Sequence, residues 1–294
     1  MSTAPALLAG LIDDAAVFPP GNAPLDVAVS RHRTHRTAAY AGLVGPLLVP
    51  ASDVEALVSE ARSGRSEAAQ PLEVGLIARP GVDPSVVVSA VERLAGESDV
   101  TAVGAELGWF PGWRDLPVGR LPLTLEIPRG PDRDRALEDV RASVDEPGHV
   151  VQAKFRTGAT PTWDWPDETE LAAFIHDCAR LGVPFKLTGG LHHAVRDEHD
   201  GEPQHGLLNV LLAVHSATHD GALVAVEALL AQRDSRLLAP AVLALADADA
   251  TRLRSLFTAY GCCEVTDPIG ELDALGILDV DDADLDDPDE ENPS

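Results

Sequence analysis

The 294-residue chain is 45% hydrophobic, which suits one large globular domain or two smaller ones. Its 48 acidic residues against 22 basic ones give a formal net charge of −26, and such a chain repels nucleic-acid phosphates and anionic lipid surfaces. No apolar run is long enough to span a bilayer, and no secretion signal begins the chain. We therefore expect a cytoplasmic protein with a small-molecule substrate and no nucleic-acid or membrane partner; the composition is compatible with a homo-oligomer.

Short apolar or β-branched runs alternate with longer helix-like stretches from about residue 8 to about residue 265. This rhythm predicts parallel strands with helical crossovers. The expected strands are 9–13, 41–49, 72–79, 101–106, 121–127, 149–155, 184–188 and 261–265. Eight such repeats in this length are typical of a closed (β/α)8 barrel of the TIM type, whereas an open doubly wound sheet leaves the eighth strand less well explained.

Helix-like segments follow most of these strands, and several begin with residues that commonly cap helices. Asp167 precedes a segment, 168–181, whose apolar residues recur at the spacing of a helix that covers a sheet: Leu171, Phe174, Ile175, Cys178 and Leu181. Segment 206–259 is nearly all helix-like, so we expect a helical insertion before the last strand. We expect one barrel domain over 1–278 and a disordered acidic tail over 279–294, where nine of sixteen residues are acidic.

Lysine is scarce in this chain, with two lysines against twenty arginines. Lys154 and Lys186 stand in similar surroundings, AKFRTG and FKLTGG, near the ends of the sixth and seventh expected strands. An ammonium group can lose its proton in a protein, whereas a guanidinium group cannot. Lysine kept at these two positions therefore indicates chemistry with a carbonyl group.

Residues at the carboxyl ends of barrel strands project into the mouth where active sites form. Lys154 and Lys186 are expected there on neighbouring strands, facing one another. Arg156 lies two residues after Lys154 and so shares its side of the strand, while Glu106 and Glu126 lie near the ends of the fourth and fifth strands. These five side chains are expected to form a charged mouth above an apolar barrel interior.

A lysine attacks a carbonyl carbon only as the neutral amine, which requires a pKa well below the usual value of about 10.4. A second cation about 7 Å away supplies only part of that decrease, so we expect Lys186, Arg156 and partial burial to act together on Lys154. A carboxylate placed too close would cancel the effect. The competing interpretation is that one or both lysines simply pair with Glu106 or Glu126 inside the barrel.

The stretch HVVQAKFRTGATPTWDW, followed by PFKLTGGLHH, resembles the end of a deoxyribose-phosphate aldolase. In that family a strand ending in K-x-S-T-G carries the Schiff-base lysine, and a following strand, V-K-x-S-G-G-I, carries a second lysine. The matching residues are Lys154, Thr157 and Gly158, then Lys186, Thr188, Gly189 and Gly190. The resemblance implies that Lys154 forms the imine, that Lys186 favours its neutral amine, and that the turn 188–190 presents N–H groups to a phosphate or other anion.

The match covers about 40 residues and departs from the aldolase pattern in three ways. Arg156 is extra, His192–His193 replace the usual following residues, and that family's aspartate relay and last-strand phosphate loop have no recognisable counterpart. Over its whole length the chain resembles an uncharacterised prokaryotic protein family with an LID-x-A-x-FPP opening and a K-x-RTG…PFK-x-T-x-GLHH…HGxLNV core. This likeness implies a shared site without naming a reaction, and it is carried by Leu11–Ile12–Asp13, Ala15, Phe18–Pro19–Pro20, His192–His193, His205–Gly206 and Asn209–Val210.

A second group of candidates follows the seventh strand, namely His192, His193, Arg196, His205 and Asn209. If Asp13 or Asp14 and Glu126 reached them across the mouth, histidine and carboxylate ligands could hold a divalent metal. No HExxH or HxH element occurs, so we favour acid–base or anion-contacting roles and expect no metal or other cofactor. The remaining histidines are expected on the surface or in packing contacts: His32, His35, His176, His199, His215 and His219.

The sequence thus favours a lyase of the class I aldolase type that acts on a small oxygenated carbonyl compound, with or without a phosphate group. Its catalytic groups are expected to be Lys154, Lys186, Glu126, Arg156 and His192. The substrate is expected to contact Thr157, Gly158, Thr188, Gly189, Gly190, His193, Arg196, His205, Asn209 and Asp13. Asp13 could instead orient a lysine or cap the following turn. The alternatives are a metal-dependent isomerase or hydrolase that uses the histidine group, and a non-catalytic barrel that binds a metabolite.

Overall fold

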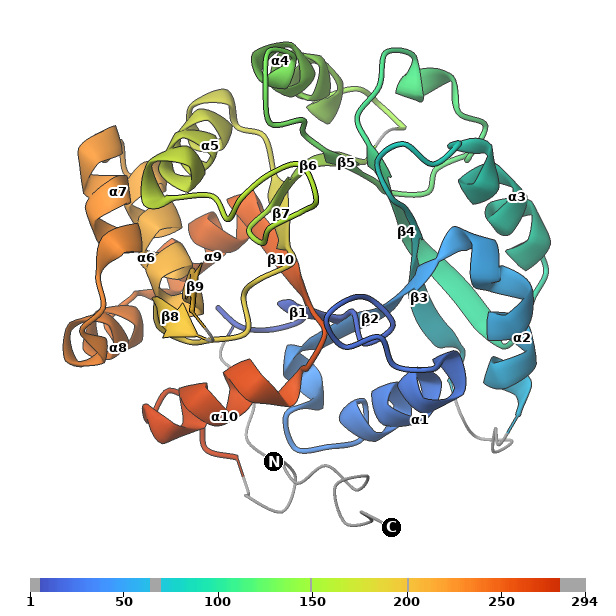
Figure 1. Ribbon diagram of the computed structural model, residues 1–294, viewed down its shortest axis with the longest axis horizontal. Helices are drawn as coiled ribbons and strands as arrows, with labels where there is room; N and C mark the ends of the chain where they lie inside the picture. Colours follow the sequence, from blue (N-terminus) through green and yellow to red (C-terminus); the bar gives the residue numbers. More distant parts are fainter. Residues whose placement is uncertain (1–5, 64–69, 149, 200, 281–294) are drawn as a thin grey trace.

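Eight parallel strands close into a barrel in the order β1–β10–β7–β6–β5–β4–β3–β2 (Figure 1). The computed structural model describes residues 6–63, 70–148, 150–199 and 201–280. The barrel strands are β1 (Ile12–Asp14), β2 (Val44–Pro50), β3 (Leu72–Ala78), β4 (Val100–Gly108), β5 (Leu123–Glu126), β6 (Val151–Arg156), β7 (Phe185–Thr188) and β10 (Phe257–Cys262). The predicted (β/α)8 barrel of the TIM type is confirmed, because each of these strands pairs in parallel with both of its neighbours.

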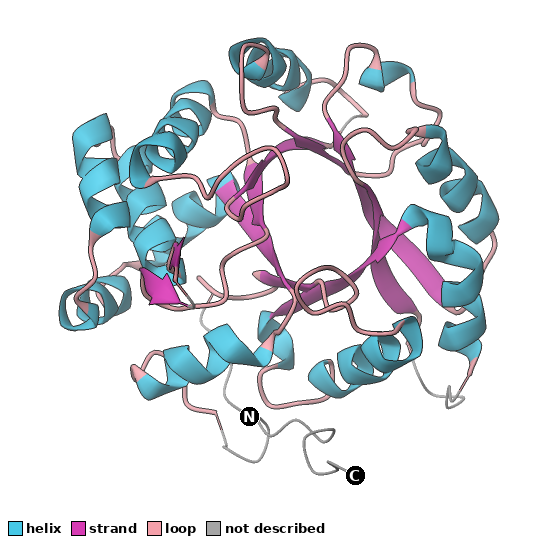
Figure 2. Ribbon diagram, in the orientation of Figure 1, coloured by secondary structure: helices cyan, strands magenta, loops and turns pink. Residues whose placement is uncertain are grey.

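Helices surround the barrel and carry the chain from the end of one strand to the start of the next (Figure 2). They include α1 (Leu25–His35), α2 (Val54–Arg62), α3 (Ser85–Leu94), α4 (Arg133–Val144), α5 (Glu168–Leu181) and, after the last strand, α10 (Thr266–Ala274). Within the described residues, the connection from β4 to β5 carries only one short 3-10 helix, Trp113–Asp115. Trp109 and Trp113 each donate an indole N–H to Asp139 Oδ2 at 2.8 Å, which fastens this loop to α4.

Between β7 and β10 the chain adds a hairpin and four helices, so the expected helical insertion is confirmed. The helices are α6 (Leu207–Thr218), α7 (Leu223–Ala231), α8 (Ser235–Leu243) and α9 (Asp247–Leu256). The hairpin pairs β8 (Asp197–His199) with β9 (Glu202–Gln204) in an antiparallel fashion. Both of its strands are polar and largely exposed, so no alternation of apolar residues marks them in the sequence.

The last barrel strand begins at Phe257, whereas the sequence predicts a strand from residue 261 and a helix before it. The apolar residues of α9 continue into the strand with helix-like spacing, which hides the boundary. The helix ends because Phe257 adopts an extended backbone, with φ −94° and ψ 101°, and pairs with Phe185 of β7. Phe257 and Tyr260 are both fully buried, as aromatic residues in a covered strand commonly are.

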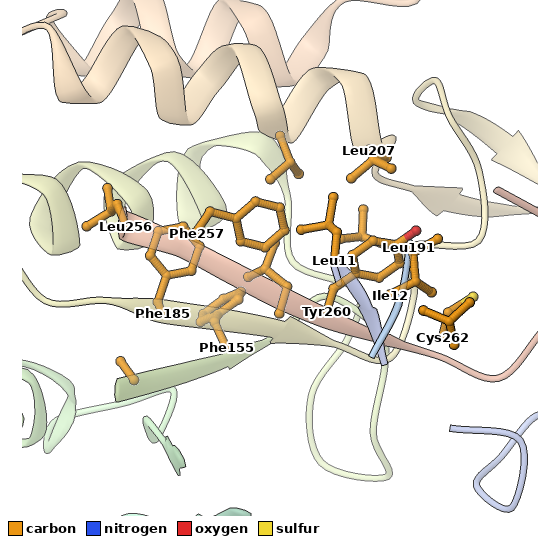
Figure 3. Close-up of a cluster of buried hydrophobic side chains, with 14 of the residues drawn as sticks. Leu11, Ile12, Phe155, Phe185, Leu191, Leu207, Leu256, Phe257, Tyr260 and Cys262 are labelled. Atoms are coloured by element: carbon orange, nitrogen blue, oxygen red, sulfur yellow. The ribbon is translucent and has the colours of Figure 1, made fainter. Parts of the chain in front are cut away.

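Helix α5 packs its apolar face against the outside of β6 and β7. Four of the five residues expected on that face are fully buried: Leu171, Phe174, Ile175 and Cys178. Phe174 stacks on Phe155, with ring centroids 4.8 Å apart, and meets Phe185 edge to face at 5.3 Å. Figure 3 shows the neighbouring part of this outer core, where Phe185, Phe257 and Tyr260 project from the strands toward the helices. Burial of each such ring stabilises the fold by about 1.5–3 kcal/mol.

Among the described residues, no helix is both long enough and apolar enough to cross a membrane.

The amino-terminal cap of α5 forms as predicted, because the Asp167 side chain accepts a hydrogen bond from Glu170 N at 2.8 Å. The expected disordered tail lies, from residue 281 onward, outside the described residues.

Candidate active site

Six charged side chains from five strands meet inside the barrel near the carboxyl ends of the strands. They are Asp13 of β1, Glu106 of β4, Glu126 of β5, Lys154 and Arg156 of β6, and Lys186 of β7. The backbone register places Glu126 beside Lys154, and Lys154 beside Lys186. The two lysines thus lie on neighbouring strands, as the sequence predicts. We call these six residues the lysine network.

Glu106 bridges the two lysines. Lys154 Nζ donates to Glu106 Oε2 at 2.9 Å, and Lys186 Nζ donates to the other oxygen, Oε1. Lys186 Nζ also donates to Asp13 Oδ2. On the other side, Lys154 Nζ lies 3.0 Å from Glu126 Oε2, and Arg156 Nε donates to Glu126 Oε1 at 3.3 Å. Acids and bases therefore alternate along one continuous series of contacts from Asp13 to Arg156.

The centre of the network is shielded from solvent. The exposed fractions of the side chains are 4% for Lys154, 7% for Glu106, 3% for Lys186 and 8% for Asp13. Burial would raise the pKa of Glu106, but the charges and hydrogen bonds of both lysines outweigh it and lower this pKa to about 2. Burial would lower the pKa of Lys186, but Asp13 and Glu106 outweigh it and raise this pKa. Burial does raise the pKa of Asp13, which receives a hydrogen bond from one lysine only.

The contacts of the two lysines agree in part with each interpretation, that the lysines face one another and that they pair with glutamates. The two ammonium groups meet, but the carboxylate of Glu106 lies between them and offsets their repulsion. The expected arrangement, in which Lys186 and Arg156 act together on Lys154, did not include this anion between the two lysines. In this arrangement Lys154 pairs with Glu106 and Glu126, as the competing interpretation requires.

The neighbouring aspartates of β1 point to opposite sides of the strand. Asp13 reaches Lys186 inside the barrel, whereas Asp14 Oδ2 lies 3.0 Å from His32 Nδ1 on α1. Gly45 of β2 leaves the space that Asp13 fills, because a Cβ atom at this glycine would lie 2.0 Å from Asp13 Oδ1. Asp13 therefore contacts a lysine, which is one of the roles that the sequence left open for it.

The barrel interior below the network is polar on one side, whereas the sequence predicts an apolar interior throughout. Gln152 lies two residues before Lys154 and faces the same side of β6. Its Nε2 donates to Thr124 Oγ1 at 2.9 Å, and Thr258 Oγ1 donates to Gln152 Oε1 at 2.5 Å. These contacts join β5, β6 and β10, while large apolar residues of the strands such as Phe155 and Phe185 face the helices instead.

Two tight turns meet where β6 and β7 end. Thr157 donates to Thr188 O through both its backbone N–H, at 2.8 Å, and its hydroxyl, at 3.1 Å. Gly158 is required at its position, because a Cβ atom there would lie 1.8 Å from Gly189 O. Gly189 has a left-handed φ of +72°, and a Cβ atom on it would lie 2.9 Å from Arg156 Nη1. The turn after β7 therefore packs directly on the Arg156 guanidinium group.

His192 and His193 have different neighbours. His192 lies beside the two cysteines at the end of β10, with Nδ1 3.6 Å from Cys262 Sγ and Nε2 3.6 Å from Cys263 Sγ. Burial, helped by the charge of His193, lowers the pKa of His192, so its ring is neutral near pH 7. His193 Nδ1 lies 2.6 Å from Glu271 Oε1 on α10. His192 is thus a neutral ring at the end of β10.

The other residues expected to contact substrate hold the segment after β7 in place. Arg196 Nη2 lies 2.7 Å from Glu168 Oε1, and its Nη1 lies 3.0 Å from His205 Nδ1. His205 Nε2 lies 2.9 Å from Pro166 O and must donate, because a carbonyl only accepts. Burial and the charge of Arg196 lower the pKa of His205 to about 4. Asn209 Oδ1 accepts from Arg196 N at 2.8 Å. A direct contact of these residues with substrate stays a prediction.

The carboxylates required by the metal-site alternative have protein partners already. Asp13 contacts Lys186, Glu126 contacts Lys154, and Asp14 contacts His32. The contact of Asp13 with a lysine was one of several roles open in the sequence, and a lysine paired with Glu106 was part of the competing interpretation. A signal for the first was present, because two neighbouring acidic residues stand at the end of the first expected strand, and one of two neighbours in a strand must face inward.

Known proteins give no direct guide to the chemistry of this site. Comparisons with family models, with curated protein sequences and with solved structures found no match. The contacts and charges of the lysine network are therefore the basis on which a function can be proposed.

Proposed function

We propose that the protein is an imine-forming lyase of the class I aldolase type, in which Lys154 attacks the carbonyl carbon of a small oxygenated substrate. The observation that carries the proposal is the buried series of contacts from Asp13 through Lys186 and Glu106 to Lys154. It supplies an amine together with a route by which that amine can lose and regain a proton. The resemblance to deoxyribose-phosphate aldolases rests on the same two lysines and supports the same reaction class.

Lys154 is the better nucleophile, because Lys186 is held more firmly as an ammonium group. Asp13 and Glu106 raise the pKa of Lys186. Lys154 shares each of its carboxylates with another cation, since Glu106 also contacts Lys186 and Glu126 also contacts Arg156. A shared carboxylate stabilises each of its partners less. These shared contacts favour Lys154 over Lys186 as the attacking amine.

The network offers this proton an acceptor. Lys154 passes a proton to Glu106, Lys186 passes one to Asp13, and Glu106, after its carboxyl group rotates, returns its proton to Lys186. Lys154 is then neutral, Asp13 is protonated, and the total charge of the network is unchanged. Burial raises the pKa of Asp13, so among these carboxyl groups it holds the proton most readily.

The neutral amine of Lys154 adds to the substrate carbonyl to form a carbinolamine, and loss of water, with one proton supplied by Asp13 through the network, gives the protonated imine. When the bond between the α and β carbon atoms breaks, its electron pair forms a carbon–carbon double bond and the C=N pair moves onto nitrogen, so an enamine remains on Lys154. Protonation of the enamine at carbon and hydrolysis by water then release the second product and free Lys154. A neutral ring such as His192 can take up the proton released from the leaving hydroxyl-bearing fragment.

The turn after β7 supports binding of an anionic group on the substrate. Gly189 brings its backbone against the guanidinium group of Arg156. Backbone N–H groups in such turns and a guanidinium group both favour phosphate or carboxylate oxygens. Arg156 lies about 7 Å along the strand from Lys154, a separation that suits a substrate of a few carbon atoms.

Reductive trapping tests this proposal. The full-length protein is incubated with small aldehydes and ketones, with and without a phosphate group, and is then reduced with borohydride and digested. Mass spectrometry is expected to find the added mass on the peptide that contains Lys154. The assignment is clear, because the only other amino groups of the chain are Lys186 and the terminal amine.

Lys154→Arg and Lys186→Arg are matched variants, because each keeps a positive charge in the network. Trapping is expected to disappear in the first and to persist in the second at a rate about 100-fold lower, since Lys186 belongs to the proton route. Addition of mass only at the terminal amine, or at Lys186 in the unmodified chain, would contradict the proposal.

A further inference from the structure

A second cluster of ionisable side chains lies outside the barrel, where helix α6 meets helix α9. His215 lies in the last turn of α6, His219 directly follows that helix, and Asp249 lies in the first turn of α9. One nitrogen or oxygen atom from each of the three residues lies within 4.8 Å of the other two. His219 Nε2 is 3.1 Å from Asp249 Oδ1, and His215 Nε2 is 3.8 Å from Asp249 Oδ2.

A hydrogen bond to a backbone carbonyl shows which ring nitrogen of His219 carries a hydrogen, and the other ring nitrogen is the one near the Asp249 carboxylate. His219 Nδ1 lies 2.9 Å from His215 O, and because a carbonyl oxygen only accepts, Nδ1 must carry the hydrogen. In the neutral ring Nε2 then has a lone pair that points at Asp249 Oδ1, which also has only lone pairs. Two acceptors 3.1 Å apart require a cation between them, either a proton on His219 or a metal ion.

The geometry of the cluster suits a metal ion of the zinc type. Zinc binds nitrogen and oxygen at about 2.0–2.2 Å, so two ligands of a tetrahedral site lie about 3.3–3.6 Å apart. The 3.1 Å from His219 to Asp249 is slightly shorter than this range and the 3.8 Å from His215 to Asp249 slightly longer, so each ligand requires only a small movement. The bond from Nδ1 to a backbone carbonyl is the outer contact that metal-ligating histidines commonly make.

The surroundings of the cluster leave it accessible to solvent and include one positive charge. The side chains remain 29%, 37% and 31% exposed for His215, His219 and Asp249, so a metal and a water ligand can reach them. Arg252 donates to Thr218 O at 3.5 Å, and its charge beside the cluster weakens the binding of any cation.

We infer that His215, His219 and Asp249 form a binding site for one divalent transition-metal ion such as Zn²⁺, with solvent as the fourth ligand. The metal joins the first and last helices of the insertion, α6 and α9. Helix α9 leads directly into the start of β10, so the metal would join α6 to the helix that precedes the last barrel strand. The metal ion thus stabilises the packing of α6 against α9 and is separate from the lysine network.

Metal titration of the full-length, chelator-treated protein tests this inference. Zn²⁺ is titrated at pH 7.5 against a chromophoric chelator, with excess Mg²⁺ present to occupy other carboxylates. We expect one ion per chain and, at about 100 times the dissociation constant, a rise in Tm of about 5 °C or more. His215→Ala, His219→Ala and Asp249→Asn are each expected to weaken binding at least about 10-fold. Arg252→Gln is expected to strengthen it several-fold.

His176→Ala removes another partly exposed helical histidine and should leave the affinity unchanged. The Co²⁺ spectrum separates this site from Cys262 and Cys263, because thiolate ligands add a strong near-ultraviolet band. That band, or zinc binding that the three ligand variants leave intact, would overturn the inference, as would a Tm that zinc does not raise. Reductive trapping at Lys154 should be the same with and without the metal, so either proposal can fail alone.

Discussion

Glu106 decides the stability of the lysine network, because each of its two oxygens accepts a hydrogen bond from a different lysine. Glu106→Gln keeps the shape of this side chain but leaves two buried ammonium groups without the anion between them. Removing one partner from a buried ion pair commonly costs about 3–5 kcal/mol, so we expect the free energy of unfolding to fall by this amount. Urea denaturation at pH 7 measures the change.

Glu55→Gln is the matched control. Glu55 Oε1 accepts from Arg93 Nε at 2.8 Å, but 73% of its side chain is exposed, so solvent screens the pair. The same substitution here should change the free energy of unfolding by less than about 1 kcal/mol. If both variants lost equally little stability, the ion pairs of Glu106 would contribute little to folding.

The meeting of the two lysines could be predicted from single positions in the sequence, but the sequence left open which of Glu106 and Glu126 would lie between them. Residues at the ends of neighbouring parallel strands come to the same mouth, so the strand assignment already places Lys154 beside Lys186. Glu106 starts on β4 and reaches side chains on β6 and β7, past the intervening β5. Contacts over this distance depend on how the barrel closes and on the side-chain rotamers, and the spacing of residues in the sequence predicts neither.

At the scale of the element, the turns that end β6 and β7 can approach only because Gly158 has no side chain. A Cβ atom at this position would overlap the backbone of Gly189 at 1.8 Å, and backbone cannot move aside as a flexible side chain can. Gly158→Ala is therefore expected to lower the free energy of unfolding by about 2–3 kcal/mol and to reduce trapping at Lys154. Thermal unfolding and borohydride reduction measure the two effects.

Gly104→Ala is the control for this prediction, because a Cβ atom at Gly104 would lie 3.4 Å from Pro122 O, an ordinary contact. We expect a change below about 1 kcal/mol for this variant. Equal stability of the two variants would show that the turns tolerate a wider separation.

The strand and helix assignments succeeded where a segment had one clear period and failed where two patterns overlapped. The buried stripe of α5 and the rhythm of eight strands are long-range patterns that the sequence displays directly. The spacing of Phe257 and Tyr260 is compatible with both a helix face and a buried strand. The strand forms because this segment pairs with β7, which is distant in the sequence. The hairpin β8–β9 is short and polar, so it has no apolar signal.

For the whole molecule, acid stability is expected to depend on His205. The folded protein binds a proton at His205 only near pH 4, because of burial and Arg196, whereas the unfolded chain does so near pH 6.5. Its contribution to stability is therefore complete above pH 6.5 and is lost as the pH falls toward 4, by about 3 kcal/mol. Glu106, whose pKa is lowered to about 2 from 4.5, adds a second loss below pH 4.5.

His205→Gln tests the upper part of this range, because glutamine can donate to Pro166 O and accept from Arg196 without titrating. The stability of the unmodified protein relative to this variant should decrease by about 3 kcal/mol between pH 7 and pH 4 in urea denaturation. Changes in surface repulsion affect both proteins and cancel in the comparison. His176→Gln should show the pH dependence of the unmodified protein, and parallel curves for the His205 variant would refute the assignment.

The lysine network contains three acids and three bases, so it contributes nothing to the formal charge of −26. That charge is carried by the rest of the chain, and its field repels an incoming phosphate or carboxylate from a distance. A neutral barrel interior provides no opposing long-range attraction. Selection of an anionic substrate must then occur after arrival, through hydrogen bonds made at contact, and collisions with unsuitable anions end without capture.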